Sequence, residues 1–386
     1  MDFGLSEEQR LIVDSLRAFV ERELYPHEAE VERLGRVPPD LARSIREKAI
    51  AQGFYAANMP AEHGGAGLDA VTVTLMDMEL GRASYALNHL VARPYTVLRA
   101  CEGHMVDAFL RPTVRGEKVE CIAMTEPEAG SDLRCMRTFA ARDGDDYVIN
   151  GTKHFISKAD IADFVILFAA TGSEETPRGT RARISCIFVD KATPGLTVRP
   201  GYTCISHRGY NNFILEFDDC RVPARNLLGA EHGGLDLAKT WLGATRVQVA
   251  AMAVGRARRA TDLAGEWAVT RRQFGQPIGD FQGVAFKLAD MATEIRAAEV
   301  MTLASAWALD QGTAGDSDAA MTKLFATEML GRVADQAVQI HGGMGLMEET
   351  PVARIWRDAR VERIWDGTSE VQRHMISRAM LKSYGG

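Results

Sequence analysis

Two short motifs, far apart in the chain, concentrate the side chains that could do chemistry. The first, TEPEAGSD at Thr125–Asp132, gathers hydroxyls, a glycine and a proline-fixed bend into one loop. The second, WDGTSEVQR at Trp365–Arg373, places the acid Asp366 beside a glycine and two hydroxyls. A carboxylate in such a setting can accept a proton, and a loop rich in hydroxyls and backbone N–H groups can hold a polar ligand. We expect the two motifs to serve one site.

The composition is that of a globular protein with a large core. The chain has 386 residues, of which 46% are hydrophobic and 25% are charged, enough for two or three domains. Lys and Arg number 45 against 52 Asp and Glu, which gives a net charge of −7, and no long basic run occurs. Nucleic-acid binding and attachment to an anionic membrane are therefore not expected.

The cysteines and the N-terminus favour a cytoplasmic protein. The six cysteines show no CxxC spacing, and the first ten residues do not resemble a signal or transit peptide. No apolar run approaches the ~20 residues that a membrane-spanning helix needs. We expect reduced thiols and no membrane span. The nine histidines show no metal-ligand spacing, so no metal is predicted.

The chain predicts an α+β fold in the order helices, strands, helices. Ser6, with Gln9 three residues later, is the expected N-cap of the first helix. Its apolar stripe is Leu11, Val13, Leu16, Phe19 and Val20. Short β-branched runs then lie at Tyr147–Ile149, Phe164–Phe168, Ile184–Val189 and Phe213–Phe217. A second helical stripe comprises Val284, Leu288, Met291, Ile295 and Ala298.

These patterns define three expected domains. We expect an N-terminal all-α domain at 1–120, a central antiparallel, barrel-like β domain at 121–232 and a C-terminal four-helix bundle at 233–386. The stretch GGAGLDA nominally fits the dinucleotide pattern GxGxxA through Gly65, Gly67 and Ala70. No buried strand precedes it, so we interpret it as a turn that follows Pro60.

The hydroxyl and backbone N–H groups of the two motifs are of the kind that a bound flavin needs. An isoalloxazine ring needs donors for its carbonyls and N5, and a pyrophosphate needs backbone N–H groups or an arginine. With KHFIS at Lys153–Ser157, RRQFGQPIGDFQ from Arg271 and QIHGG from Gln339, the chain resembles the acyl-CoA dehydrogenases along nearly its whole length. This family uses FAD to desaturate acyl-CoA thioesters, and the resemblance implies its three-domain fold.

By this resemblance, the isoalloxazine half of FAD is held by residues of the β domain. Thr125 lies at the pyrimidine edge, while Gly130 and Ser131 bring N–H and O–H groups to the cofactor and the thioester. Phe155 stands where the family has a tryptophan that covers the flavin, and Ser157 stands where a threonine bonds N5. The other cofactor contacts implied near the ring are Met124, Thr368 and Glu370.

The resemblance implies that the adenosine half of FAD is bound across a subunit interface. The implied residues are Arg271, Gln273, Phe274, Gln282, Gln339, Gly342 and Gly343. FAD binding then requires at least a dimer, and the usual assembly of the family, which we expect here, is a homotetramer. The implied electron acceptor is an electron-transferring flavoprotein.

The implied catalytic base is Asp366, which takes the α-proton of the thioester. A minority of the family carries the base on an earlier helix, but Thr245 occupies that place here and cannot take a proton. The backbone N–H of Asp366 would also donate to the thioester oxygen. The implied substrate contacts are Ser131, Arg246, Trp365 and Gly367.

Aspartate replaces the usual glutamate of the family at this position. The change shortens the reach by roughly 1.5 Å, and a misplacement of about 1 Å can cost ~100-fold in rate. Either the loop lies nearer, or a ring or branched acyl group carries its α-carbon differently. Two alternatives stay open: a nitroalkane-oxidase-type flavoenzyme, whose base is also an aspartate, and a weakly catalytic FAD-binding partner subunit.

Other departures bear on the substrate. Gly243 stands where some members have an aspartate that contacts pantetheine, so Arg246 is the remaining match in GATR. By resemblance, Leu87–Arg99 helps to form the far end of the acyl cavity. That segment contains Asn88, His89, Arg93 and Tyr95 and is not uniformly apolar. A compact cyclic or branched acyl-CoA is therefore expected in preference to a long straight chain.

Overall fold

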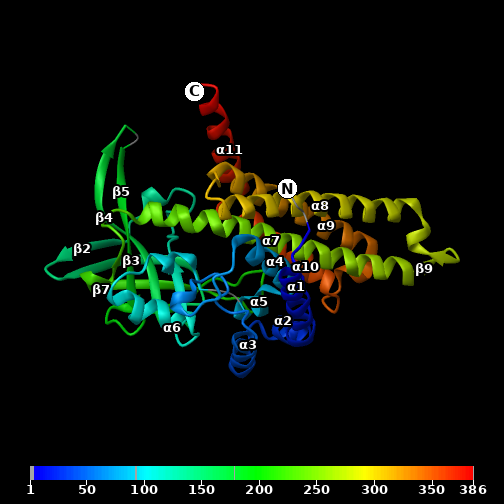
Figure 1. The fold of residues 1–386 in the computed structure, drawn as a ribbon, viewed down its shortest axis with the longest axis horizontal. Helices are drawn as coiled ribbons and strands as arrows, with labels where there is room; N and C mark the ends of the chain where they lie inside the picture. Colours follow the sequence, from blue (N-terminus) through cyan, green and yellow to red (C-terminus); the bar gives the residue numbers. More distant parts are fainter. Residues whose placement is uncertain (1–3, 92–93, 178, 386) are drawn as a thin grey trace.

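The chain folds in three parts that follow the predicted order. The computed structural model describes residues 4–91, 94–177 and 179–385. A helical part comes first, a β-sheet follows, and long helices complete the chain (Figure 1). The sheet lies at one end of the molecule, and the long helices run from it to the other end (Figure 1). The predicted α+β fold class is confirmed.

The N-terminal part begins where the sequence indicated. The Ser6 hydroxyl accepts from the Gln9 N–H, and the Gln9 side chain accepts from the Ser6 N–H, both at 3.1 Å. Leu16 and Val20 are fully buried, but Leu11 is 63% exposed, so its assignment to the core was wrong. At about 100° per residue, Leu11 lies on the side of the helix opposite Val13 and Val20. The helices are α1 (Glu7–Phe19), α2 (Glu28–Leu34), α3 (Pro39–Ala51), α4 (Ala70–Leu80), α5 (Tyr85–Val91) and α6 (Arg111–Val114).

The central part is one eight-stranded sheet in the order β6-β7-β3-β2-β4-β5-β8, with β1 added beside β4. Most pairs are antiparallel as predicted, but β1 and β2 each pair with β4 in parallel. Side chains alternate along β4, so that Phe164 and Ile166 enter one core and Val165 enters another. The strands are β1 (Glu120–Ala123), β2 (Phe139–Asp143), β3 (Asp146–Ser157), β4 (Phe164–Thr176), β5 (Gly179–Asp190), β6 (Leu196–Pro200), β7 (Asn212–Pro223) and β8 (Leu227–Leu228).

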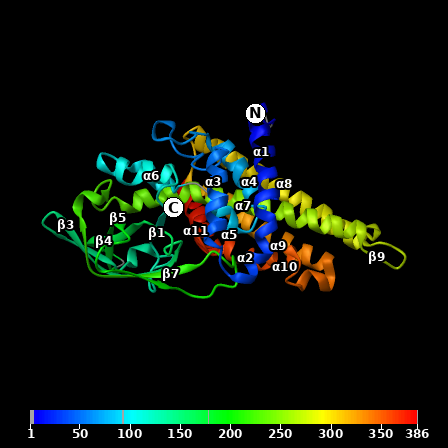
Figure 2. The same ribbon diagram turned by 90° about the horizontal axis from the view of Figure 1, so that it is seen from below.

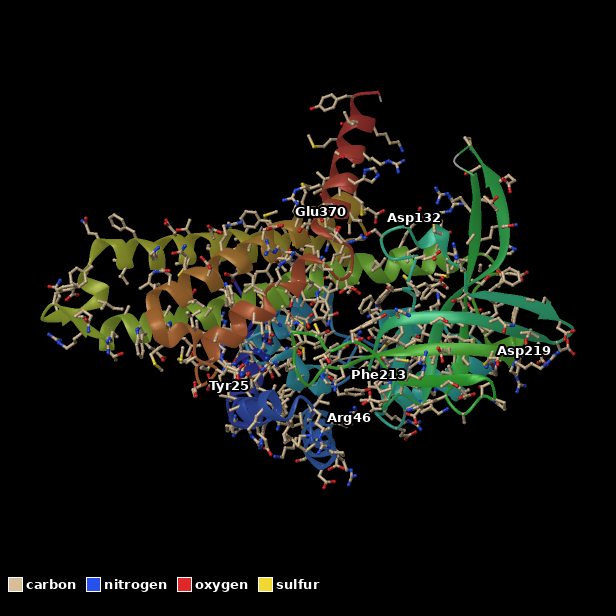
Figure 3. All side chains as sticks on the ribbon, turned by 180° about the vertical axis from the view of Figure 1, so that it is seen from behind. Tyr25, Arg46, Asp132, Phe213, Asp219 and Glu370 are labelled. Carbon is tan, nitrogen blue, oxygen red and sulfur yellow. The ribbon has the colours of Figure 1, made fainter. Side chains whose placement is uncertain are left out.

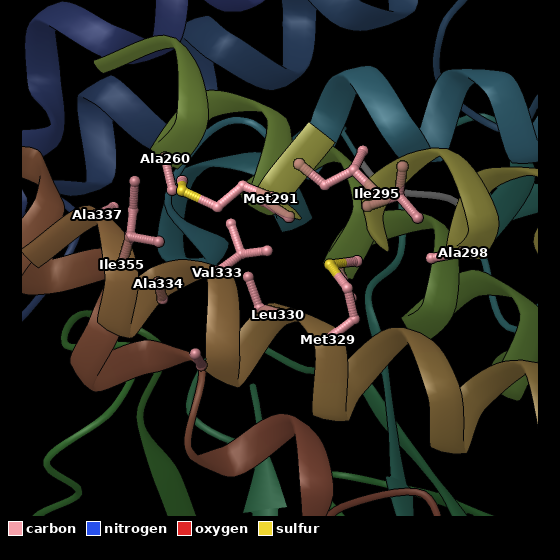
Figure 4. Close-up of a cluster of buried hydrophobic side chains, with 14 of the residues drawn as sticks. Ala260, Met291, Ile295, Ala298, Met329, Leu330, Val333, Ala334, Ala337 and Ile355 are labelled. Carbon is pink, nitrogen blue, oxygen red and sulfur yellow. The ribbon is translucent and has the colours of Figure 1, made fainter. Parts of the chain in front are cut away.

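The C-terminal part is built around three long helices. Its helices are α7 (Gly234–Thr270), α8 (Gln282–Asp310), α9 (Asp316–His341), α10 (Pro351–Asp358) and α11 (Ser369–Ser383). Their core is rich in alanine, which lets the helix axes approach closely (Figure 4). The predicted face of α8 is buried at Met291, Ile295 and Ala298. The last helix, α11, packs on α9 and projects away from the bundle (Figure 1).

The N-terminal helices lie across the middle of α7, as two perpendicular views show (Figure 1, Figure 2). The backbones of α4 and α7 meet closely at Gly255, where an added Cβ would lie 1.8 Å from the Met78 carbonyl oxygen. Glycine is therefore required at this crossing. The GGAGLDA segment forms a turn, as predicted, with Gly67 at φ +62°. In the part of the chain that the structure describes, no helix has the length and apolar composition needed to cross a bilayer.

Candidate active site

Asp366 lies in a strained turn that precedes α11. Its φ is +51°, a region that few residues other than glycine adopt, and Gly367 follows with φ +92°. Lys323 on α9 holds this turn, because its ammonium donates to the Trp365 oxygen at 2.7 Å and to the Gly367 oxygen at 2.6 Å. The Gln372 amide also donates to the Gly367 oxygen, at 2.8 Å. The turn that carries the predicted base is thus fixed from two sides.

The surroundings of Asp366 tune its carboxyl toward proton transfer at neutral pH. Burial raises the pKa of Asp366 to about 6, with a further increase from Glu362, while Lys323 and Arg246 act in the opposite direction. The residue as a whole is nevertheless only partly buried. A carboxylate with a pKa near the working pH is suited to act as a general base.

A buried cluster of charged side chains packs against the turn and binds the Trp365 side chain. The Trp365 indole N–H donates to Glu362 at 2.8 Å, and Glu362 also pairs with Arg256. His207 lies 3.3 Å from Glu362 and 3.4 Å from Asp358. Burial raises the pKa of Glu362, but Arg256 and His207 more than offset this effect and bring it to about 2. Trp365 is therefore anchored by its indole nitrogen, and its ring stacks on that of His207 with 5.1 Å between centroids.

Aromatic rings surround Asp366 on the other side. The Tyr85 ring lies 5.0 Å from the Trp365 ring and 4.7 Å from the Tyr210 ring, between centroids. The charge of Asp366 contributes to raising the pKa of both tyrosines, although burial is the larger cause. His89, one turn along α5, packs 4.8 Å from Tyr210. Tyr85 and His89 come from α5 and Tyr210 from the segment before β7; of these three, only His89 lies in a segment to which the sequence gave a role.

The TEPEAGSD loop is held by a buried ion pair that the sequence did not indicate. Lys153 on β3 is fully buried and donates to Glu126 at 2.8 Å and to the Met124 oxygen at 3.0 Å. Burial lowers the pKa of Lys153 to about 8, although Glu126 raises it. The His154 N–H donates to the Thr125 oxygen at 2.8 Å. The loop is therefore docked on β3, where the KHFIS segment lies.

A β-bulge sets the directions of the KHFIS side chains. The register between β3 and β7 shifts between Lys153 and Ile156, and Phe155 in between has φ +58°. Phe155 consequently points outward, 58% exposed, with its ring 5.4 Å from that of Tyr202. Ser157 is partly buried and lowers the pKa of Tyr210, whereas Asp366 raises that pKa, so both residues lie near Tyr210. The structure thus brings Ser157 and Asp366 to the same region.

A pocket of about 470 Å³ opens beside Ser131, between the loop and α11. Figure 3 shows Asp132 on this loop and Glu370 at the start of α11. The pocket is lined by Ser131, Asp132, Arg134, Thr176, Pro177, Arg181 and Arg378. Gly130 and Ser131 are exposed, as their predicted ligand contacts require. Thr368 caps α11 by accepting from the Val371 N–H at 3.2 Å, which gives this predicted cofactor residue a structural task as well.

Arg246 on α7 also approaches Asp366. It is buried, and its Nε has no hydrogen-bond partner among the described residues. Burial lowers its pKa, whereas Asp316 and Asp366 raise it. The neighbouring Thr245 hydroxyl donates to the Trp241 oxygen at 2.9 Å, and Gly243 leaves open space around it. Arg246 is thus a buried guanidinium, close enough to Asp366 for the two charges to interact, with one donor that no described residue satisfies.

The residues predicted for the adenosine half of FAD gather elsewhere in this chain. Arg271 ends α7, and the β9–β10 hairpin (Arg272–Gln273 with Gln276–Pro277) follows at the end of the bundle far from the sheet (Figure 1). His341, near Gln339, stacks 5.2 Å from Trp267 on the last turns of α7. Arg271, Gln273, Gln282, Gln339, Gly342 and Gly343 are all exposed, and Phe274 is 95% exposed. One chain therefore holds two separate groups of predicted cofactor residues.

Two further expectations concern the segment Leu87–Arg99. Asn88 is fully buried and donates to the Leu80 and Ala83 oxygens, so it ends α4 and does not face the site. The Tyr95 ring receives the Lys158 ammonium on its face at 4.6 Å, and its N–H donates to Glu120. Arg93 lies outside the described residues.

Comparisons with known proteins cover the whole chain. Residues 6–117, 121–220 and 232–381 match the N-terminal, middle and C-terminal domains of acyl-CoA dehydrogenase, respectively. A probable acyl-CoA dehydrogenase of Bacillus subtilis, YngJ, is 39% identical and aligns with 99% of this chain and 100% of its own length.

Two other similar proteins have more specific names. The cyclohex-1-ene-1-carbonyl-CoA dehydrogenase of Geobacter metallireducens is 38% identical over 98% of this chain and 99% of its own. The structure of butyryl-CoA dehydrogenase from Megasphaera elsdenii superimposes with a TM-score of 0.91 at 33% identity, covering 99% of this chain and 100% of that one.

Proposed function

Because the chain belongs to the acyl-CoA dehydrogenase family of FAD-dependent oxidoreductases, we propose that it oxidises an acyl-CoA thioester to the 2-enoyl-CoA with Asp366 as the base. The observation that carries this proposal is the turn of Asp366. Lys323 fixes the turn, burial raises the pKa of the carboxyl to about 6, and the residue is only partly buried. A structural aspartate would not need this combination.

The chain's own residues bind, orient and deprotonate the substrate. Asp366 takes the α-proton, and its backbone N–H is the donor proposed for the thioester oxygen. Arg246, with its free Nε, and the arginines of the pocket beside Ser131 offer positive charge to the CoA moiety. Bound FAD would supply the acceptor for the hydride that leaves the β-carbon. Thr125, Gly130, Ser131, Phe155 and Ser157 are the residues that we propose to hold its ring.

The distance between the two groups of proposed FAD-binding residues supports a site shared between two subunits. The ring-binding group lies by the sheet, whereas the β9–β10 hairpin lies at the far end of the bundle (Figure 1). A second subunit has to bring that end to the sheet of the first. Exposed apolar side chains favour such an assembly, and we propose the homotetramer usual in the family. They include Phe274, Leu346, Met380, Leu381 and Tyr384.

The proposed substrate is a compact cyclic or branched acyl-CoA. The rings of Tyr85, Tyr210 and Trp365 pack on one another near Asp366, and we take this to favour a compact acyl group. An aspartate is also shorter than the usual glutamate, so the α-carbon has to come closer to the turn. The Geobacter relative is named for an acyl group that contains a ring.

Reduction of the bound flavin tests this function. The purified protein should be yellow, and its colour should bleach anaerobically with a cyclic or branched acyl-CoA. Electrons should then pass faster to an electron-transferring flavoprotein than to O₂. A nitroalkane oxidase would instead be reduced by nitroethane and form peroxide without responding to CoA esters. If no CoA ester bleached a fully FAD-loaded protein, the proposal would be wrong.

A further inference from the structure

The exposed ring of Phe155 is held by two neighbouring rings to which no role has yet been given. The Tyr202 ring lies 5.4 Å from it between centroids, and the His154 ring lies 6.2 Å from it. Among the residues that the structure describes, these are the rings that contact Phe155. Phe155 is 58% exposed and Tyr202 is 53% exposed. Because more than half of Phe155 lies outside the core, its orientation depends on these two contacts.

The backbone of Phe155 also needs support from its surroundings. Its φ is +58°, which a bulky side chain adopts only where neighbouring structure holds it. It lies within the β-bulge, where the register of β3 on β7 shifts between Lys153 and Ile156. On one side, the His154 N–H donates to the Thr125 oxygen at 2.8 Å, which ties the bulge to the TEPEAGSD loop. The ring of Phe155 projects on the other side.

Tyr202 is fixed through both its backbone and its hydroxyl. Its N–H donates to Asn212 Oδ1 at 3.0 Å, and the Asn212 amide donates to the Tyr202 oxygen at 2.7 Å. Gly201 allows this close approach, since an added Cβ would lie 2.2 Å from Asn212 Oδ1. The Tyr202 hydroxyl shares a hydrogen bond of 3.1 Å with His154 Nδ1. A tyrosine held at both ends can restrain the ring beside it.

We propose that Tyr202 is a positioning residue for FAD, because its ring holds Phe155 in the orientation that covers the isoalloxazine. The inference rests on the proposed function, in which Thr125 and Phe155 help to hold this ring. His154 joins these two residues to Tyr202, through its backbone to Thr125 and through its imidazole to the Tyr202 hydroxyl. Tyr202 then completes the connection by packing on Phe155. Aromatic pairs of this kind stabilise each other beyond the area that they bury.

The release of FAD from the diluted holoenzyme tests this role without turnover. Flavin fluorescence rises as FAD leaves the protein and gives the rate of release. Tyr202→Ala should speed release about fivefold, which corresponds to about 1 kcal/mol, the size expected for one aromatic pair. Tyr202→Phe keeps the ring but loses the bond to His154, so its rate should lie between those of the alanine variant and the wild type. The visible circular dichroism of the bound flavin should change most in Tyr202→Ala.

A double-mutant cycle separates positioning from a general effect on the fold. Phe155→Ala should itself speed release, and adding Tyr202→Ala should then have little further effect, because Tyr202 acts through the ring that is gone. Phe139→Ala is the matched control, since it removes a 43% exposed ring from β2 of the same sheet. It should leave the rate of release unchanged. Melting temperatures measured with excess FAD verify that each variant is folded.

Three results would overturn the inference. They are wild-type release from Tyr202→Ala, an effect of this variant that is as large without the Phe155 ring as with it, and an unchanged rate in Phe155→Ala. In each case the dehydrogenase function would still stand if an acyl-CoA bleached the flavin of the wild-type protein. A wild-type protein that neither contained FAD nor took it up would overturn both the inference and the proposed function.

Discussion

The ammonium of Lys323 donates to the carbonyl oxygens of the two residues that flank Asp366, at 2.7 Å to Trp365 and 2.6 Å to Gly367. Lys323 is fully buried on α9. Burial lowers its pKa to about 8, although the charges of Asp366 and Glu362 raise it. The contact has two effects. It holds the left-handed turn that aims the base, and its charge lowers the pKa of the Asp366 carboxyl.

Replacing Lys323 by methionine should impair both effects. Lys323→Met removes the donor to the Trp365 carbonyl, at a cost of about 1–3 kcal/mol, and frees the turn. A base displaced by about 1 Å can lose ~100-fold in rate, so we expect flavin reduction to slow at least about tenfold. The acid limb of its pH profile should also move to higher pH, because the charge that lowers the pKa of Asp366 is gone.

Thr327→Val provides the control on the same helix. Thr327 is fully buried and donates to the Lys323 oxygen at 2.9 Å, one turn away from the ammonium contact. This variant should lose some thermal stability but keep the wild-type pH profile. An unchanged acid limb in Lys323→Met would show that the lysine acts only on folding.

Asp366→Asn should abolish proton abstraction while leaving the cofactor bound. The amide keeps the size of the side chain but accepts no proton, so reduction by substrate should fall by at least ~100-fold. FAD content and the melting temperature are measured alongside. Glu349→Gln, which changes an exposed acid elsewhere, should have no effect. Near wild-type reduction by the asparagine variant would disprove the assignment of the base.

The pH dependence of flavin reduction should report the ionisation of Asp366. Burial raises the pKa of this carboxyl to about 6, so the active carboxylate predominates above that pH. Below it, kcat/KM should fall about tenfold for each pH unit, because the base becomes protonated. Stopped-flow reduction between pH 5 and pH 8 measures this limb. An acid limb centred near pH 4, the ordinary range of an aspartate, would contradict the burial of the site.

The sequence predicted the order of the helices and strands and the positions of the two motifs, because these features depend on local patterns. Ser6 with Gln9 forms the predicted cap, TEPEAGSD lies in a loop, and the second motif is a turn that leads into α11 at Ser369. Lys323 was missed because an isolated lysine in a helical pattern normally lies in solvent. Its partners lie about forty residues later in the chain, and only the packing of α9 under the turn brings them together.

Side-chain contacts between distant segments could not be predicted from the sequence either. Lys153 lies within a recognised motif and Glu126 in another, yet nothing in either motif indicates that the two meet in the core. Tyr85 and Tyr210 come from segments with no chemical pattern of their own. Asn88, expected near the acyl cavity, instead caps α4, because a buried amide near a helix end satisfies its carbonyls.

The last prediction is that Arg271 is needed both for FAD binding and for assembly of the subunits. Arg271→Ala removes an exposed guanidinium at the end of α7, far from the sheet of its own chain (Figure 1). If this arginine serves FAD in a neighbouring subunit, FAD content and the proportion of assembled protein should fall together, because a ligand bound only by the assembled state stabilises it. Absorbance and light scattering on one size-exclusion run measure both quantities. Arg22→Ala, an exposed arginine on the N-terminal part, should change neither. A monomer that retained full FAD would show that one chain is sufficient for the site.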